Sequence, residues 1–201
     1  MDQSTHTHSS PVRDTIIAEG QRIMSGKGFS AVGLNEILTT ARVPKGSFYH
    51  YFASKDAFGV ALLEHYFDTY LAEIDALFSQ AKLSKADALI RYFKCWRSKQ
   101  LPDDCHGKCM VVKLGAEVAD LSEPMRHALK LGTAGIIGRL AGAIEGGVAE
   151  GSVGAQAPAA ILAETLYQLW LGASVMAKIS RDAAPFDAAM STTKQLLQLP
   201  H

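Results

Sequence analysis

The stretch 35-NEILTTARVPKGSFYHYFASKDAF-58 decides the fold. It holds a short run with apolar residues at helical spacing, then Pro44, then a second run in which Phe48 and Phe52 lie four residues apart. Proline suits the start of a helix because its missing N–H needs no partner there. Two short helices joined by a tight turn are the outline of a helix-turn-helix. Composition and periodicity alone also allow an ordinary helical hairpin.

The second run divides into two faces. Phe48, Tyr51 and Phe52 can pack inward, and the other positions carry short polar or basic side chains and a glycine. A DNA-reading helix needs this division, with apolar anchors behind, hydrogen-bonding groups in front and a small residue where the backbone approaches the groove. The candidate DNA-contacting residues are Lys45, Gly46, Ser47, Tyr49 and His50, with Arg42 in the preceding turn.

Lys55 stands where a basic residue is unexpected. Ser54 is a good N-cap and Asp56 suits a first helical turn, but a lysine between them opposes the helix dipole. The conflict disappears if a phosphate docks at this helix end, because the free backbone N–H groups and the ammonium then share one anion. We therefore expect Lys55 to contact the DNA backbone.

The rest of the chain is also helical in pattern. Apolar residues recur every three or four positions and no sustained alternating run predicts a strand, so the fold class is all-α. Proline and Ser/Asp/Gly clusters separate the expected helices. We expect a flexible tail over 1–10, a three-helix helix-turn-helix domain over 11–53 and a helical regulatory and dimerisation domain over 54–201. Later helices are expected over 84–99, 106–119, 122–150, 158–180 and 185–199.

Composition limits the partners. The 201 residues include 20 acidic and 20 basic side chains, so the case for DNA rests on where the basic residues lie. Apolar runs are shorter than the roughly 20 residues that span a membrane, and the first ten residues lack a secretory signal. Three cysteines cannot all pair with one another. In an intracellular protein they are expected to be free thiols. We expect a soluble, cytoplasmic protein with no membrane association.

A longer stretch carries a family resemblance. The segment 28-GFSAVGLNEILTTARVPKGSFYHYFASKDAF-58 resembles the N-terminal DNA-binding domain of the TetR family of bacterial repressors, and the resemblance is close over about residues 11–58. It implies a three-helix DNA reader followed by a helical domain that binds an inducer and forms a dimer. It also assigns DNA contacts to Lys45, Ser47, Tyr49 and His50 and a phosphate contact to Lys55. Gly33 departs from the pattern, since family members often have Thr or Ser there.

A dimer interface is expected in the last long helices. A two-fold dimer doubles the contacts of a small reader on a palindromic operator. One apolar stripe has the spacing for such an interface, with burial inside a single subunit as the alternative. The stripe consists of Leu162, Leu166, Leu169, Trp170, Ala173 and Ala177, completed by Leu196 and Leu197.

The segment 103-DDCHGKCMVVKLGAEVADLSEPM-125 holds the candidate sensor. Cys109 lies near the start of an expected helix, with Lys108 beside it and Lys113 four residues later. Helix N-termini and nearby cations stabilise a thiolate, which is the form that oxidants and electrophiles attack. Cys105 is a candidate resolving thiol, because residues four apart on a helix are neighbours. A buried, inert cysteine is the alternative for Cys109.

The resemblance adds to this segment. 109-CMVVKLGAEVADLSEPMR-126 is similar to the TetR branch that responds to reactive electrophiles, which implies that Cys109 is the switch and that a small reactive inducer is the signal. Lys178 is a lone lysine on an otherwise apolar helix and a candidate covalent or electrostatic partner. Cys95, beside Trp96, is expected in the core.

Three other interpretations stay open. A reversible apolar or planar ligand could induce the repressor, in a pocket lined by Tyr92, Phe93, Trp96 and Tyr167. A thiol-dependent enzyme using Cys109 and His106 lacks an orienting carboxylate, so no enzymatic activity is expected. A metal sensor would have only Cys105, His106 and Cys109 as local ligands; we predict no metal and no cofactor. The small residues Gly132, Gly135, Gly138 and Gly142 indicate close helix packing or space for a ligand, because no strand precedes them.

Overall fold

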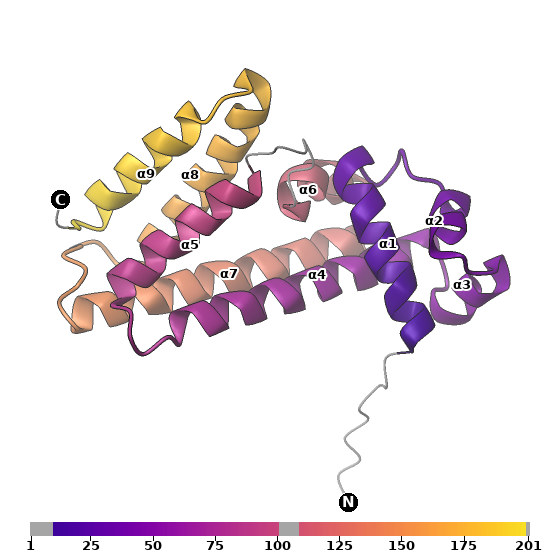
Figure 1. The fold of residues 1–201 in the computed structure, drawn as a ribbon, viewed down its shortest axis with the longest axis horizontal. Coiled ribbons are helices and arrows are strands. Elements are labelled where there is room, and N and C mark those ends of the chain that lie inside the picture. The colour runs from indigo at the N-terminus through magenta and orange to yellow at the C-terminus, as the bar shows by residue number, and fades with distance from the viewer. Residues whose placement is uncertain (1–9, 101–108, 200–201) are drawn as a thin grey trace, which may run out of the picture.

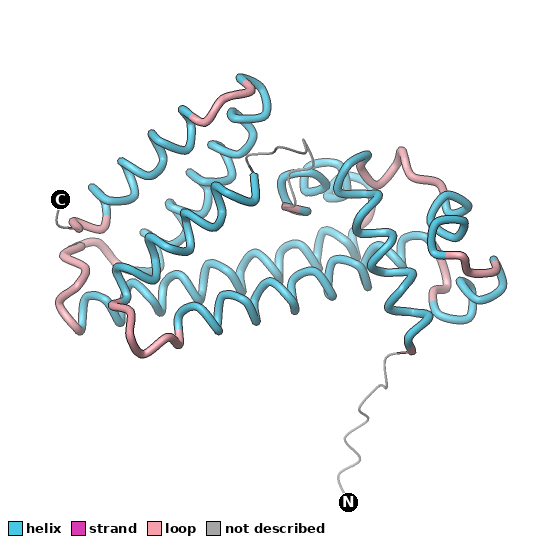
Figure 2. The backbone as a smooth tube through the Cα atoms, viewed as in Figure 1, coloured by secondary structure: helices cyan, strands magenta, loops and turns pink. Residues whose placement is uncertain are grey.

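The computed structural model describes residues 10–100 and 109–199. Within these residues the chain forms nine α-helices and no strand (Figures 1 and 2), which confirms the all-α prediction. The helices are α1 (Pro11–Lys27), α2 (Leu34–Ala41), α3 (Lys45–Tyr51), α4 (Lys55–Phe78), α5 (Lys85–Gln100), α6 (Met110–Leu121), α7 (Glu123–Ala149), α8 (Ala159–Ser180) and α9 (Ala184–Leu196).

The helices fall into two groups joined by α4. Figure 1 shows α1, α2 and α3 together at one end, and α5, α8 and α9 at the other. The long helices α4 and α7 run side by side from the first group along the second, and α6 packs against α1 and α7. Helix α6 therefore connects the two groups at a second point besides α4.

Glycine allows α4 and α7 to approach closely. A Cβ atom on Gly132 would lie 2.1 Å from the ring of Phe67, which is buried on α4. The expected role of the glycine series in helix packing is thus confirmed at Gly132. Gly138 and Gly142 have nothing within 4 Å of a built Cβ, so packing does not require glycine there.

Helix α8 is a core helix of this fold. By length and composition it is apolar enough to cross a membrane, but one side of it is buried against the rest of the chain. Trp170 has no exposed surface, stacks on Phe93 at 4.7 Å between ring centroids and donates from Nε1 to Thr193 Oγ1 at 2.9 Å. Burial in the core explains why α8 is apolar, and the hydrogen bond to Thr193 satisfies the polar atom of Trp170.

Most of the residues expected at the dimer interface are buried within one chain. Six of them lie in the core of a single chain, because that side of α8 faces its own neighbouring helices, so little of their side-chain surface is left for a second subunit. Leu169 and Leu196 are half-buried. The six are Leu162, Leu166, Trp170, Ala173, Ala177 and Leu197. The exposed apolar residues of α8 are instead Ile161, Val175, Met176 and Ile179, of which Ile179 is 69% exposed.

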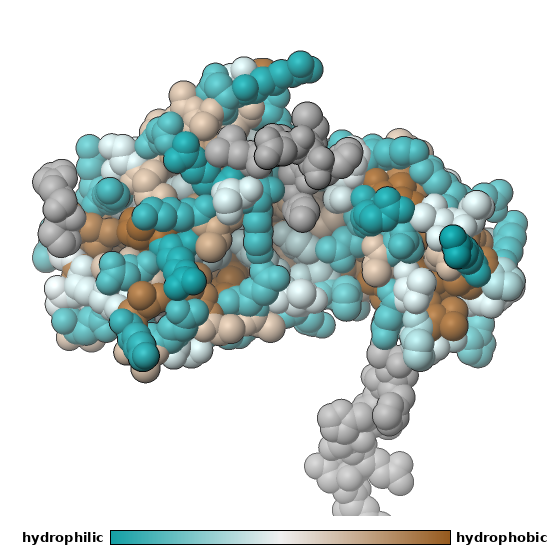
Figure 3. All heavy atoms as spheres, in the orientation of Figure 1, coloured by the Kyte–Doolittle hydropathy of each residue, from teal (hydrophilic) through white to brown (hydrophobic). Residues whose placement is uncertain are grey.

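The surface alternates between polar and apolar patches. Figure 3 shows hydrophobic residues gathered in separate patches among hydrophilic ones on the face displayed. Cys95, expected in the core, is instead exposed on α5, although the neighbouring Tyr92 and Trp96 are buried. The cysteine is therefore open to solvent.

Candidate functional site

Helix α3, the predicted DNA-reading helix, is anchored by aromatic side chains. Phe48 has no exposed surface, and its ring centroid lies 5.1 Å from that of Phe52 and 5.6 Å from that of Phe58. Tyr51 is half-buried, and its hydroxyl lies 2.8 Å from that of Ser10. The aromatic face predicted for this helix does pack inward, and it fixes the direction in which the opposite face points.

The opposite face of α3 is open to solvent. Lys45, Gly46 and His50 are exposed, Ser47 is half-buried, and Tyr49 is 54% exposed. A Cβ atom on Gly46 would meet nothing within 4 Å, so the protein itself does not need a glycine there. A missing side chain on an exposed helix leaves the backbone accessible to a partner.

Arg42 and Gly33 lie at the two ends of α2. Arg42 is exposed at the end of α2 in the left-handed conformation, with φ of 55°, and its N–H reaches the carbonyls of Leu38 and Thr39. Its side chain is thus free to extend beside α3. Gly33 caps α2 in an extended conformation without a side-chain hydrogen bond, as expected for a residue that offers no hydroxyl.

Lys55 has a partner inside the protein. Its Nζ donates to the Phe29 carbonyl at 2.8 Å and lies 4.5 Å from the centroid of the Phe29 ring. These contacts offset its unfavourable position at the start of α4, where Ser54 is the N-cap and accepts from the Ala57 N–H. An ammonium has three donors, so the predicted phosphate contact stays possible but is no longer the only reason for a lysine here.

Cys109 is the N-cap residue of α6 and has a free, half-buried thiol. The Tyr66 hydroxyl lies 3.9 Å from its Sγ. The thiol lines a cavity of about 350 Å³ between α4 and α5. The cavity is lined by Gln21, His65, Tyr66, Thr69, Tyr70, Glu73, Trp96, Lys99, Gln100 and Cys109.

The thiol is less acidic than its helix position predicts. Burial raises the pKa of Cys109, and this effect outweighs the backbone N–H groups of Val112 and Val111, the Tyr66 hydroxyl and the positive charge of Lys178, which lower it. The net direction is thus opposite to the one expected from the helix start and the neighbouring lysines. Desolvation could not be read from the sequence, where only the helix start and the lysines were visible.

The residues expected around Cys109 have different fates. Lys178 lies on α8 close enough for its charge to lower the pKa of Cys109, although no hydrogen bond joins the two among the described residues. Burial and the charge of Lys113 lower the pKa of Lys178, whereas a Cys109 thiolate raises it. The charge of Lys113 lowers the pKa of both Lys178 and Glu117. Cys105, together with His106 and Lys108, lies outside the described residues.

The aromatic pocket expected for a reversible ligand is only partly present. Trp96 lines the cavity beside Cys109. Tyr92, Phe93 and Tyr167 are buried in the core, and none of them lines that cavity. Sequence reasoning missed Gln100, whose Oε1 is buried with no hydrogen-bond partner in the described part of the chain.

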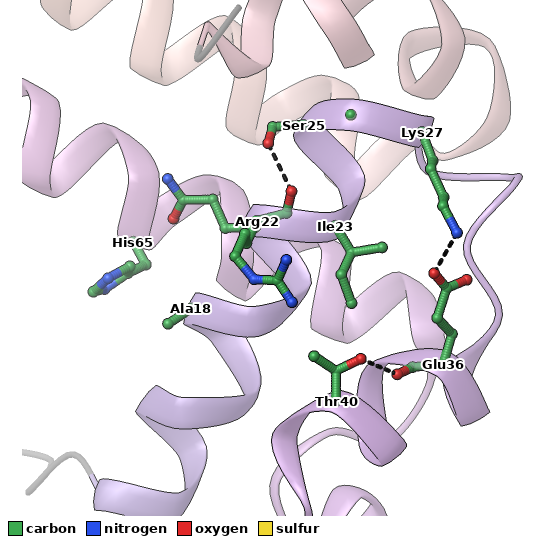
Figure 4. A pocket seen from close by; sticks show the side chains of 10 residues that line it. Ala18, Arg22, Ile23, Ser25, Lys27, Glu36, Thr40 and His65 are labelled. Atoms are coloured by element: carbon green, nitrogen blue, oxygen red, sulfur yellow. Dashed lines mark hydrogen bonds and ion pairs between the residues drawn. The ribbon is translucent and has the colours of Figure 1, made fainter. Parts of the chain in front are cut away.

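A second hollow, of about 870 Å³, lies along α1 and adjoins the first, because both include Gln21 and His65. Figure 4 shows its other end, where Lys27 reaches across to Glu36 on α2 at 2.5 Å. Arg22 pairs with Glu19 at 2.9 Å. Both cations therefore already have carboxylate partners. Among the described residues no group of three or more His, Cys, Asp or Glu side chains could hold a metal ion.

Comparison with known proteins places the chain in a family. Residues 16–62 match the family described as bacterial regulatory proteins, tetR family, and residues 86–193 match a tetracyclin repressor-like C-terminal domain. The chain is 38% identical to the HTH-type transcriptional repressor NemR of Escherichia coli, over 94% of both chains. It is 33% identical to the transcriptional regulator AcuR of Cereibacter sphaeroides, over 92% of this chain and 84% of that protein.

Solved structures agree with this assignment. The crystal structure of the reduced form of E. coli NemR is similar with a TM-score of 0.90 and 38% identity, covering 95% of this chain and 99% of that one. A regulatory protein TetR from Rhodobacter sphaeroides is similar with a TM-score of 0.80 and 33% identity, over 93% and 99% of the two chains. The reading helix, the helical body behind it and these matches lead to one conclusion: the chain belongs to the TetR family of helix-turn-helix transcriptional regulators.

Proposed function

We propose that the protein is a cytoplasmic, homodimeric transcriptional repressor that releases its operator when Cys109 is modified by a small electrophile or oxidant. The observation that carries the proposal is the position of Cys109, whose free thiol faces a cavity at the start of the helix that packs against α1. Residues 11–53 would read DNA and residues 54–201 would sense the signal and dimerise. The protein would have no enzymatic activity.

The exposed face of α3 supports the DNA-reading role. Its polar side chains stand opposite an aromatic anchor, and Gly46 leaves the backbone open. Phosphate contacts from Arg42, Lys45 and Lys55 would make binding depend on salt. Base contacts from Tyr49 and His50 would set the sequence preference. A palindromic double-stranded operator would match two such helices in a dimer.

The surroundings of Cys109 support the switch. Addition of an electrophile to the sulfur forms an S–C bond and releases the thiol proton, and the new group must occupy the cavity or push its walls apart. Because Cys109 caps α6, such a change acts first on that helix. Lys178 and Cys105 would be secondary participants, through charge and through a second thiol.

A second candidate is relief by reversible binding of a small ligand in the same cavity. The buried Oε1 of Gln100, which has no hydrogen-bond partner among residues 10–100 and 109–199, favours it, since a ligand with an O–H or N–H group would satisfy this acceptor. The cysteines would then be incidental. Induction that survives in a variant without cysteines would support this candidate and contradict the thiol switch.

The test is operator affinity measured by fluorescence anisotropy on DNA from the region upstream of the protein's own gene. Wild type, Cys109→Ser and Cys95→Ser are compared with and without one equivalent of an electrophile or hypochlorous acid. Cys95 is the matched control because its thiol is exposed. Release from wild type and Cys95→Ser, but not from Cys109→Ser, is expected. Equal release from all three would refute sensing at Cys109, and continued consumption of electrophile would indicate an enzyme.

A further inference from the structure

Glu117 on α6 holds the loop that follows α1. Its Oε2 accepts a hydrogen bond from the Phe29 N–H at 3.1 Å, and its Oε1 accepts one from the Ser30 N–H at 2.6 Å. Two adjacent backbone N–H groups thus share one carboxylate that lies almost 90 positions later in the sequence. Hydrogen bonds to an ionised group are about twice as strong as neutral ones. Glu117 therefore fixes the position of the 28–30 loop relative to α6.

Gly28 shows how closely the loop and the carboxylate fit. Its φ is +96°, in the left-handed region that favours glycine, and a Cβ atom there would lie 2.9 Å from Glu117 Oε2. Any other residue would be strained by the backbone and would press against the carboxylate. The loop needs glycine at the point where Glu117 docks.

Phe29 connects this contact to the start of α4. Its N–H binds Glu117, while its carbonyl and ring both contact the ammonium of Lys55. The Phe29 ring is buried, and a Cβ atom on Gly59 of α4 would lie 2.8 Å from it. Lys55 follows the end of α3 by four positions, so one residue joins the helix capped by Cys109 to the end of the reading helix.

The environment of Glu117 agrees with an ionised carboxylate in this role. Burial acts to raise its pKa, but the Ser30 side chain and the backbone N–H groups of Ser30 and Phe29, with the charge of Lys113, lower it overall. The carboxylate is therefore charged at neutral pH. A charge held by two N–H groups loses more when it is displaced than a neutral contact would.

We propose that Glu117 is the positioning residue that couples Cys109 to DNA binding. Glu117 holds the 28–30 loop and Lys55 in the arrangement that binds the operator. Modification of Cys109 displaces Glu117 and thereby releases the DNA. This inference rests on the proposed function. In this structure both Glu117 contacts are formed, and the proposal assigns this arrangement to the DNA-binding state. Displacement of α6 by an adduct would open both contacts.

The test compares Glu117→Gln with Asp120→Asn. Both substitutions remove one negative charge from α6, but Asp120 is exposed. Glutamine keeps the shape of the glutamate side chain but replaces one carboxylate oxygen with an NH₂ group. This group cannot accept a hydrogen bond, so the contact with either the Phe29 or the Ser30 N–H is lost. Operator affinity is measured by anisotropy for the reduced protein and after alkylation of Cys109 with iodoacetamide, and alkylation is verified by peptide mass spectrometry.

The expected result is a loss of coupling. Glu117→Gln should bind the operator at least about fivefold more weakly than wild type when reduced, with little further loss on alkylation, while Asp120→Asn behaves as wild type. A general loss of stability would not shrink the ratio between reduced and alkylated affinities. Wild-type affinity and wild-type release in Glu117→Gln would overturn the inference.

A second readout does not depend on DNA. Hydrogen exchange at the Phe29 and Ser30 amides should become faster when wild-type Cys109 is alkylated, and it should already be fast in Glu117→Gln. Unchanged exchange at these amides on alkylation would overturn the inference even if the protein proves not to be a repressor. Failure of wild type to bind DNA, or to release it on alkylation, would instead refute the proposed function.

Discussion

The substitution Tyr66→Phe tests whether the tyrosine hydroxyl supports the Cys109 thiolate. The hydroxyl lies 3.9 Å from Sγ and lowers the pKa of Cys109 against the larger, opposite effect of burial. A hydrogen bond to a charged group contributes about 1.5–3 kcal/mol at good geometry. At this distance we take about half of that, which is up to about a tenfold change in the ratio of thiolate to thiol.

The sign of the effect depends on pH. Removing the hydroxyl raises the pKa of Cys109 further, so at neutral pH about tenfold less thiolate is present. The more basic thiolate is a better nucleophile, and with a Brønsted slope of about 0.5 this recovers about threefold. Alkylation of Cys109 should therefore be about threefold slower in Tyr66→Phe at neutral pH. Above both pKa values it should be faster than in wild type, so the two pH–rate curves cross.

The assay follows iodoacetamide labelling of the Cys109 peptide by mass spectrometry from pH 6 to above the raised pKa of Cys109. Measuring this peptide by itself separates its labelling from that of exposed Cys95. Tyr70→Phe is the matched control, because the Tyr70 ring stacks on Tyr66 at 5.8 Å but its hydroxyl donates to Tyr92. Tyr70→Phe should follow the wild-type curve more closely. Equal or faster labelling of Tyr66→Phe at neutral pH would refute the reasoning.

The remaining predictions concern packing and the DNA surface. Gly132→Ala should lower the free energy of unfolding by about 1–3 kcal/mol, because the new Cβ would lie 2.1 Å from the Phe67 ring; calorimetry with Gly138→Ala, where nothing lies within 4 Å, is the control and should show no loss. Trp170→Ala should cost about 3–5 kcal/mol in denaturant unfolding, since the side chain is fully buried; a cost below about 1 kcal/mol would contradict its core position. Tyr49→Ala should weaken operator binding by about 1–3 kcal/mol without changing the unfolding midpoint, because the side chain is exposed; unchanged affinity would remove Tyr49 from the DNA contacts.

The sequence was most informative where local rules decide the structure. Pro44 precedes α3, Ser54 caps α4 through its side chain, and Phe48 and Phe52 pack inward as their spacing predicts. These features depend on residues within one or two turns of each other. The division of α3 into a buried and an exposed face follows from the same short-range pattern.

Long-range contacts could not be predicted in this way. Glu117 binds amides almost 90 positions away, and nothing in its own segment distinguishes it from a solvated glutamate. The cavity that Cys109 lines is formed by residues of α1, α4 and α5, and the charge that acts on the thiol comes from Lys178 on α8. The sequence therefore identified the sensor candidate but gave the wrong direction for its pKa.

Helix α8 shows why an apolar stripe does not identify an interface. The helix carries apolar residues on most of its sides, so its pattern has no single preferred direction. Trp170 shows that this side of α8 belongs to the core, because its indole N–H donates a hydrogen bond to Thr193 of α9 in the same chain. The side left exposed, with Ile161, Val175, Met176 and Ile179, is the apolar surface of α8 available to a second copy. We therefore expect a dimer built through α8 to use this exposed side, with the half-buried Leu169 and Leu196 as the members of the predicted stripe still accessible to it.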